Sequence, residues 1–254
     1  MGKKLPKLLT PREVEQMRKN AKIHKKIFEK IREVVKPGTT AVEIDKLCGD
    51  MARDAGVLCA FRGQYGFPAN ICISSNDVVA HGVPHEGLVF HEGDLVNFDF
   101  GIKDKQLGIY TDSGITFVIG GDDKNPVGAH MVEVNKKALY AGIAQARAGN
   151  TIGDIGYAIQ TVVEDAGFHI IRDLSGHGIG KKVHEEPYIY NYGTPGTGLK
   201  LKAGMTIAIE PLIGEKTGNI TDEGGFELYV SDGSLGCQYE HTILITEGEA
   251  EIII

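Results

Sequence analysis

The chain contains no tryptophan, no CxxC or other paired cysteine spacing, and no run of the roughly 18 apolar residues that a membrane-spanning helix needs. We therefore expect no membrane span. The four cysteines are isolated, which is typical of reduced thiols in a cytosolic protein and not of a disulfide framework. They are Cys48, Cys59, Cys72 and Cys237.

Positive charge is also scarce relative to negative charge. The formal net charge is -7 and the pI is about 5.7, so composition gives no support for direct nucleic-acid binding. The basic start of the chain (Lys3, Lys4 and Lys7) is short and lacks the apolar core of a signal peptide. We expect a cytoplasmic globular protein, and its 254 residues suffice for one large domain or two small ones.

Two helix start signals stand close to the N-terminus. Thr10-Pro11-Arg12-Glu13 combines an N-cap, a proline in the first turn and a glutamate three residues after the cap. This pattern predicts a helix that ends at Lys36-Pro37-Gly38. A second helix is predicted over residues 40–55, and Gly56 closes it.

The second half of the chain repeats this arrangement. Asp54-Ala55-Gly56 recurs as Asp165-Ala166-Gly167 at an offset of 111 residues, and the same offset relates Thr40 to Thr151. We interpret the chain as a single domain of residues 1–254 with two pseudo-repeats, at about 10–124 and 125–254. Chance likeness between two amphipathic helices is the alternative.

Segments rich in β-branched and aromatic residues follow the helices in each half. Helices followed by strands in both halves indicate an α+β fold with a mainly antiparallel sheet. The predicted strands are residues 70–75, 77–80, 94–102, 109–119, 205–213, 226–230 and 237–246.

Two aspartates lie on the first pair of alternating strands. A hairpin centred on the polar turn at residues 103–108 pairs Asp99 directly with Asp112 and points both to one face. Two like charges placed opposite each other destabilise a hairpin unless a cation lies between them. Solvated acids on an exposed face are the alternative, which the apolar neighbours Phe98 and Phe100 disfavour. We predict that both aspartates are metal ligands.

One histidine lies in a glycine-dense loop, Ser175-Gly176-His177-Gly178-Ile179-Gly180. Glycine lets the backbone pass close to a cofactor or substrate, and no phosphate-loop pattern fits this segment. His184 follows seven residues later as a second imidazole. Tyr188 stands where the second histidine of an HExxH zinc motif would be, so that motif is absent.

Two glutamates lie in otherwise apolar strands beside small or polar residues. Glu210 is predicted to share a strand face with Ala208, and Glu240 to share one with Gln238 and Thr242. Such neighbours indicate an inward-facing polar pocket, although a cross-strand ion pair would explain either glutamate alone.

Taken together, the four carboxylates and one imidazole are a ligand set for two divalent cations. Buried in one pocket without cations, four carboxylates would face a prohibitive desolvation and repulsion cost. Two divalent ions neutralise the four negative charges, and a bridging water then loses its proton readily. The resulting hydroxide is suited to attack an amide carbonyl, so the pattern predicts a two-metal hydrolase.

These segments, in this order, resemble the type I methionine aminopeptidases, which have the pita-bread fold. The resemblance extends from Thr10 to Ile254. From Asp99 to Asp112 is thirteen residues, two more than is usual in the family, so we expect a longer hairpin turn that keeps the two aspartates paired. The matching motifs are residues 75–82, 97–99, 111–113, 175–180, 184–187, 209–211 and 238–242.

The resemblance implies a methionyl aminopeptidase with one catalytic domain. Such an enzyme removes the initiator methionine from nascent polypeptides with a small second residue, by attack of a hydroxide that bridges two divalent metals. Asp112 and Glu240 would bridge the metals. Nascent N-termini are the implied partners, and a ribosome contact is implied because nascent chains emerge there. The implied metal ligands are Asp99, Asp112, His177, Glu210 and Glu240.

The resemblance also assigns catalytic roles to three residues. His81 would hydrogen-bond the scissile amide near its nitrogen. His184 would stabilise the oxyanion of the tetrahedral intermediate. Glu210 would take a proton from the metal-bound water and deliver it to the leaving amine.

The methionine pocket is implied less specifically. Phe67, Cys72 and Phe226 align with pocket positions of the family, and their soft or aromatic character suits a thioether. Ordinary core packing is the alternative for all three. Gln64 stands where a tyrosine is often found, and Val183 where an aromatic residue is common, so the pocket shape is expected to differ.

Two other functions stay open. A Xaa-Pro aminopeptidase or dipeptidase shares this fold but usually adds a large N-terminal domain. A non-catalytic peptide-binding module of the same fold would have lost ligands, whereas all five are present. The absence of an N-terminal zinc-binding extension favours the short, bacterial-type form. The ligand types are compatible with Mn, Co, Fe or Zn, and a monomer is expected because no exposed apolar stripe is evident.

Overall fold

The structure is a computed structural model that describes residues 8–254. The basic start predicted to lack a signal peptide (Lys3, Lys4 and Lys7) lies outside the described residues. Within residues 8–254, none of the helices combines the length and the apolar character that crossing a membrane would require.

Residues 8–254 include four long helices, and the two in the first half begin where the sequence predicts. The four helices are α1 (Pro11–Val34), α2 (Ala41–Asp54), α3 (Pro126–Gln145) and α4 (Ile152–Asp165). At the start of α1 the Thr10 hydroxyl accepts from the Glu13 backbone N–H, and the Glu13 carboxylate accepts from the Thr10 backbone N–H. Thr40 and Glu43 form the same capping box at α2. Local capping chemistry therefore sets these helix starts.

The offset of 111 residues reappears in the bounds of the helices. Val34 and Gln145, which end α1 and α3, are 111 residues apart. Isolated β-bridges join Thr40 to Val89 and Thr151 to Lys200, and both members of these pairs differ by the same offset. These equivalences support the internal repeat, which stays a prediction.

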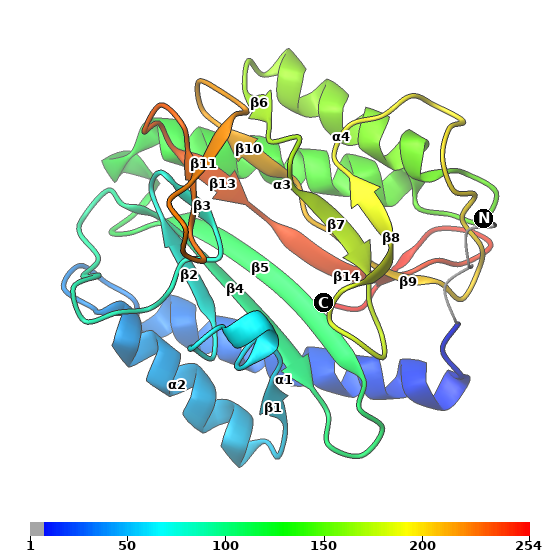
Figure 1. The fold of residues 1–254 in the computed structure, drawn as a ribbon, viewed down its shortest axis with the longest axis horizontal. Helices are drawn as coiled ribbons and strands as arrows, with labels where there is room; N and C mark the ends of the chain where they lie inside the picture. Colours follow the sequence, from blue (N-terminus) through cyan, green and yellow to red (C-terminus); the bar gives the residue numbers. More distant parts are fainter. Residues whose placement is uncertain (1–7) are drawn as a thin grey trace.

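The main sheet has nine strands and is antiparallel at every pairing within the described residues, so the predicted α+β class is confirmed. Its order is β1-β4-β5-β14-β9-β7-β8, with β2 added to β4 and β15 to β14 (Figure 1). Their bounds are β1 (Leu58–Cys59), β2 (Cys72–Ser75), β4 (Leu95–Lys103), β5 (Tyr110–Val118), β7 (Ser175–Gly178), β8 (Glu185–Tyr190), β9 (Thr206–Ile209), β14 (Glu240–Leu244) and β15 (Glu251–Ile252).

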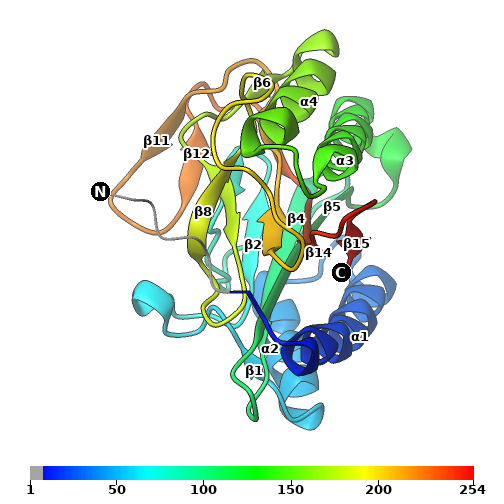
Figure 2. The same ribbon diagram turned by 90° about the vertical axis from the view of Figure 1, so that its right-hand side faces the viewer.

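Helices and short strands lie on opposite sides of this sheet. Figure 2 shows α1 and α3 on one side and β11 and β12 on the other. Two three-stranded sheets, β13-β10-β6 and β11-β12-β3, complete the fold. The remaining elements are β3 (Val78–Ala80), β6 (His169–Ile170), β10 (Leu212–Gly214), β11 (Ile220–Asp222), β12 (Leu228–Val230), β13 (Gly236–Gln238), η1 (Gln64–Gly66) and η2 (Asp122–Lys124).

Two predicted strands are wrong in their continuity. Residues 205–213 divide into β9 and β10, because Pro211 has no N–H to donate to a ladder. Residues 237–246 divide into β13 and β14 at Tyr239, and β14 ends at Leu244. In both cases the break falls next to a glutamate of the predicted metal site, Glu210 or Glu240.

The core between the sheet and the helices is dense and aromatic. Phe98 and Phe100 on β4 are fully buried together with Phe90. The ring centroid of Phe98 lies 5.8 Å from that of Phe90 and 5.2 Å from that of Phe117. Such packing gives the opposite face of β4 and β5 a rigid support.

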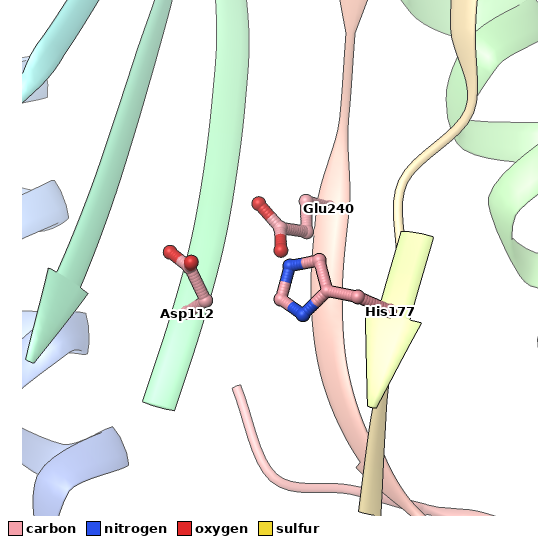
Figure 3. A group of neighbouring side chains, drawn as sticks. All are labelled: Asp112, His177 and Glu240. Atoms are coloured by element: carbon pink, nitrogen blue, oxygen red, sulfur yellow. The ribbon is translucent and has the colours of Figure 1, made fainter. Parts of the chain in front are cut away.

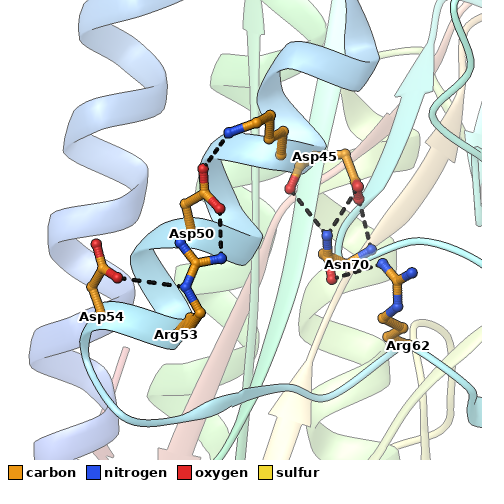
Figure 4. A network of polar contacts seen from close by, with 7 residues as sticks. Asp45, Asp50, Arg53, Asp54, Arg62 and Asn70 are labelled. Atoms are coloured by element: carbon orange, nitrogen blue, oxygen red, sulfur yellow. Dashed lines mark hydrogen bonds and ion pairs between the residues drawn. The ribbon is translucent and has the colours of Figure 1, made fainter.

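A single carboxylate on α2 holds the loop between β1 and β2 (Figure 4). The Asn70 backbone N–H donates to Asp45 Oδ1 at 2.6 Å, and Asn70 Nδ2 donates to Asp45 Oδ2 at 2.9 Å. The loop carries Phe61 and Phe67, which are both buried. Asp45 thus fixes where these two rings are placed.

We expect Asp45→Ala to lower the free energy of unfolding by about 1–3 kcal/mol, because it leaves a partly buried backbone N–H without a partner. Denaturant unfolding measures this change. Asp50→Ala is the matched control on the same helix, since the Asp50 carboxylate contacts only the exposed side chains of Lys46 and Arg53. Equal losses in the two variants would contradict the tethering role of Asp45.

Candidate metal centre

Two carboxylates meet across the middle strand of the sheet because that strand has a glycine between them. Gly114 on β5 is opposite Asp99 on β4 and also opposite Glu240 on β14. A Cβ at Gly114 would lie 3.6 Å from Glu240 Oε2, so the missing side chain leaves space between the acids. Asp112 lies two residues from Gly114 and therefore projects from the same face.

The predicted direct pairing of Asp99 with Asp112 is wrong. Asp112 is opposite Gly101, so the two aspartates are diagonal neighbours on one face. The cause is the turn, which the buried Asp104 organises by accepting backbone N–H bonds, including one from Leu107 at 2.7 Å to Oδ1 and one from Ile109 at 2.6 Å to Oδ2. The hairpin therefore turns over residues 104–109.

His177 is placed by the two glycines beside it. A Cβ at Gly176 would lie 2.3 Å from the Ala208 carbonyl oxygen, and one at Gly178 would lie 2.3 Å from the Glu186 carbonyl oxygen. No larger residue fits at either position. His177 Nδ1 bonds the Gly178 carbonyl oxygen at 3.0 Å, which leaves Nε2 directed at Glu210 Oε1, 3.4 Å away.

Three of the five predicted ligands converge on one point (Figure 3). Asp112, His177 and Glu240 each offer a ligand atom, and these atoms all lie within 4.8 Å of one another. Glu210 adjoins this group through His177, and Gln238 Nε2 donates to Glu210 Oε2 at 3.2 Å. Asp99 adjoins it through Asp112, whose pKa is raised by the negative charge of Asp99 in addition to burial.

The electrostatics of the cluster require positive charge. Burial raises the pKa of Glu210 and Glu240 well above the usual range and that of Asp99 to about 7. Among residues 8–254, Asp99 Oδ1 and Glu240 Oε1 are buried without a hydrogen-bond partner. No lysine or arginine in that range forms a salt bridge with these acids.

Hard carboxylate oxygens and one neutral imidazole form a donor set that fits divalent cations. Burial lowers the pKa of His177 to about 3, so its ring is neutral and keeps a lone pair for a metal. Divalent cations between the acids would neutralise the buried charge and occupy the unpartnered oxygens.

The acid–imidazole cluster of Asp99, Asp112, His177, Glu210 and Glu240 lines a cavity of about 380 Å³. Two more imidazoles line the same cavity, those of His81 and His184, and the centroid of the His184 ring lies 4.5 Å from that of His177 in an edge-on arrangement. Burial lowers the pKa of both His81 and His184, so both rings are neutral near pH 7. Every predicted site residue lines this cavity: Phe67, Cys72, His81, Asp99, Asp112, His177, His184, Glu210, Phe226 and Glu240.

The apolar wall joins segments from both halves of the chain. The rings of Phe67 and Phe226 meet edge to face at 5.3 Å. The segment with Phe226 is held by Glu227, whose Oε1 accepts from the Val83 backbone N–H at 3.2 Å. Gln64 lines the cavity, whereas Val183 is buried in the same apolar cluster as Phe67 and Cys72. Phe67, Cys72 and Phe226 therefore belong to the hydrophobic core and also line the cavity.

Several lining residues escaped the sequence analysis. Tyr65 is 83% exposed, and its ring stacks on that of His184 at 6.3 Å. Tyr188 and Asp173 also line the cavity, although no motif in the sequence marks either as a site residue. The alternating tyrosines at 188, 190 and 192 were the available signal. The role of Gln238 became visible only through its bond to Glu210.

Comparison with known proteins places the chain in a defined class. It matches metallopeptidase family M24 over residues 15–247 and belongs to that family, so it is a metal-dependent hydrolase. It is 38% identical over 242 residues to a methionine aminopeptidase of Clostridium acetobutylicum, covering 95% of each chain.

Solved structures agree with this placement. The crystal structure of methionine aminopeptidase from Thermotoga maritima matches with a TM-score of 0.94 and 39% identity, over 98% of this chain and 99% of that chain. Prolidase from Pyrococcus furiosus matches with a TM-score of 0.78 and 25% identity, over 97% of this chain and 64% of that chain. The predicted pita-bread fold is confirmed.

We expect Mn²⁺ to raise the melting temperature of protein freed of metal by a chelator more at pH 8 than at pH 5.5. Acids whose folded pKa is raised favour folding below their unfolded pKa and lose that contribution as the pH rises through the folded pKa. The metal-free protein should therefore lose stability toward pH 8, and added cations should restore it there because they relieve the repulsion between the acids. Thermal unfolding at both pH values checks this, and a larger shift at pH 5.5 would contradict it.

Proposed function

We propose that the chain is a methionyl aminopeptidase that releases N-terminal methionine from polypeptides with a small second residue. The observation that carries the proposal is the buried acid–imidazole cluster at the floor of a cavity with an aromatic wall. The relatives named methionine aminopeptidase, matched over nearly their whole length, support this specificity.

The proposed cofactor is a pair of divalent ions. Asp112 and Glu240 would be shared between the ions, and the donors would be Asp99, Asp112, His177, Glu210 and Glu240. When bound, the ions supply charge neutralisation and activate water as a nucleophile for the peptide carbonyl. Co, Mn, Fe and Zn are all compatible with this donor set.

Glu210 is suited to move the proton that the reaction requires. Gln238 orients its Oε2, and His177 lies beside its Oε1. Burial raises the pKa of Glu210, which makes its carboxylate a stronger base than an exposed one. We assign it to accept the proton of the attacking water and to deliver it to the leaving amine nitrogen.

The two upper imidazoles act as neutral hydrogen-bond donors. His184, held between the rings of Tyr65 and His177, would donate to the carbonyl oxygen as negative charge develops on it. His81 would hydrogen-bond the scissile amide near its nitrogen. Because both rings are neutral near pH 7, neither repels the substrate's free ammonium group.

The methionine side chain would occupy the space between Phe67, Cys72 and Phe226. Burial raises the pKa of the Cys72 thiol, so it stays protonated and presents a soft, uncharged sulfur. The two phenylalanines pack edge to face and both line the cavity, so they would offer aromatic surface to the thioether. Cys72 is opposite Asp99 on the neighbouring strand, which links this pocket to the metal floor.

The proposal extends to the setting of the enzyme. Nascent polypeptides in the cytoplasm are the expected substrates, with a ribosome contact where the chains emerge, and the enzyme is expected to act as a monomer. The whole chain would form one catalytic domain with pseudo-repeats at about 10–124 and 125–254. Four free cysteines support a reducing compartment.

Release of the N-terminal residue from a peptide panel tests the proposal. After chelation and addition of Mn, Co, Fe or Zn, we expect cleavage of peptides that begin Met-Gly and Met-Ala, and little cleavage of Met-Lys, Leu-Gly or Ala-Pro. Liberated amino acid is the readout. Cleavage of Ala-Pro alone would favour a Xaa-Pro peptidase, and no cleavage with any metal would favour the non-catalytic module.

We expect His184→Ala to lower kcat on a Met-Gly peptide by about 10²- to 10³-fold with a smaller change in KM, because the lost donor acts mainly in the transition state. Steady-state kinetics measure both constants. His91→Ala is the control, since that side chain is 76% exposed and lies outside the cavity. A main effect on KM would contradict the role assigned to His184.

A further inference from the structure

Three tyrosines form a row along β8 and its extension. Tyr188 and Tyr190 are 55% and 42% exposed and flank the fully buried Ile189, while Tyr192 follows two residues later. Ring centroids lie 6.4 Å apart for Tyr188 and Tyr190 and 5.5 Å apart for Tyr190 and Tyr192. Alternate residues of a strand project from one face, so we call these three side chains the tyrosine ladder.

The tyrosine ladder is continuous with the catalytic cavity. Tyr188 lines that cavity together with His177 and His184. The far end of the ladder is covered by the Arg172 guanidinium, 4.5 Å above the Tyr192 ring. Strand β8 is the last in the order of the main sheet and therefore forms one of its edges. A chain leaving the cavity past Tyr188 would therefore meet exposed tyrosine.

The backbone of this edge is not free to pair with a peptide strand. Helix α4 packs on it at Gly156, where a Cβ would lie 2.3 Å from the Tyr192 carbonyl oxygen and 2.6 Å from that of Tyr190. This contact blocks strand addition along the upper part of β8. Recognition at this surface therefore depends on the tyrosine rings.

We infer that the tyrosine ladder binds the third and following residues of an extended peptide substrate while its N-terminus is in the cavity. This inference rests on the proposed function. Tyrosine provides a large amphipathic contact area at a low cost in side-chain entropy, which suits a partner of variable sequence. From residue 188 to 192 a strand rises by about 13 Å, enough for roughly four extended peptide residues.

The inference predicts that activity depends on substrate length. On peptides that begin Met-Gly-Ala, kcat/KM should rise about tenfold from three residues to about six or seven and then level off, because one or two aromatic contacts are gained. The gain should appear as a lower KM with an unchanged kcat, because the contacts are the same in the ground state and the transition state. A phenylalanine in the peptide beyond its third residue should increase this gain in kcat/KM.

Variants at the middle of the ladder isolate its contribution. Tyr190→Ser should remove most of the gain on a heptapeptide and leave kcat/KM on the tripeptide within about twofold, whereas Tyr190→Phe should retain the gain because the ring is kept. Tyr157→Ser is the matched control, a tyrosine on α4 that is 50% exposed and outside the ladder.

The outcomes separate this inference from the proposed function. Equal kcat/KM for the tripeptide and the heptapeptide in the unsubstituted enzyme would overturn the ladder alone. Equal losses on both peptides in Tyr190→Ser would show a structural role and would overturn it too. Failure to cleave either peptide would overturn the proposed function and, with it, the inference.

Discussion

The mutual repulsion of four closely spaced carboxylates, Asp112 and Glu240 buried and Asp99 and Glu210 half-buried, constrains the rest of the site. Burial raises the pKa of all four acids, and among residues 8–254 no lysine or arginine pairs with them. A fold that retained this cluster without cations would lose stability at neutral pH for no structural gain. Divalent cations held by these acids would reverse the sign of the effect, because the repulsion would be replaced by ligand bonds and metal binding would contribute to the stability of the folded state.

Glycines at a few positions of the sheet leave space in which such ions could be held. Gly114 separates Asp99 from Glu240, and the glycines on either side of His177 let its strand approach the neighbouring carbonyls. The aromatic core beneath β4 holds these strands in place. The strands fix the positions of the proposed metal ligands, while the loops with Phe67 and Phe226 would shape the proposed substrate pocket.

Breaks in regular strand structure lie next to two of the acids in the site. Two predicted strands break at Pro211 and at Tyr239, directly beside Glu210 and Glu240. A break frees the adjacent side chain from strict alternation, which lets Glu210 reach both His177 and Gln238. The Asp104 turn has a similar effect on the first hairpin, since it moves the two aspartates from a direct pair to a diagonal one.

By itself the sequence determined the features that depend on near neighbours, namely the helix starts at Thr10 and Thr40 and the α+β class, and its motifs identified ten of the residues that line the cavity. Helix capping and the alternation of apolar and polar residues act within a few residues, so both can be recognised in the sequence. Only the tertiary structure decided the register of Asp99 and Asp112, the burial of Val183, and the row of Tyr188, Tyr190 and Tyr192 that begins at the cavity lining. These features depend on contacts between residues far apart in the chain, where one turn or one helix packing against a strand sets which side chains meet.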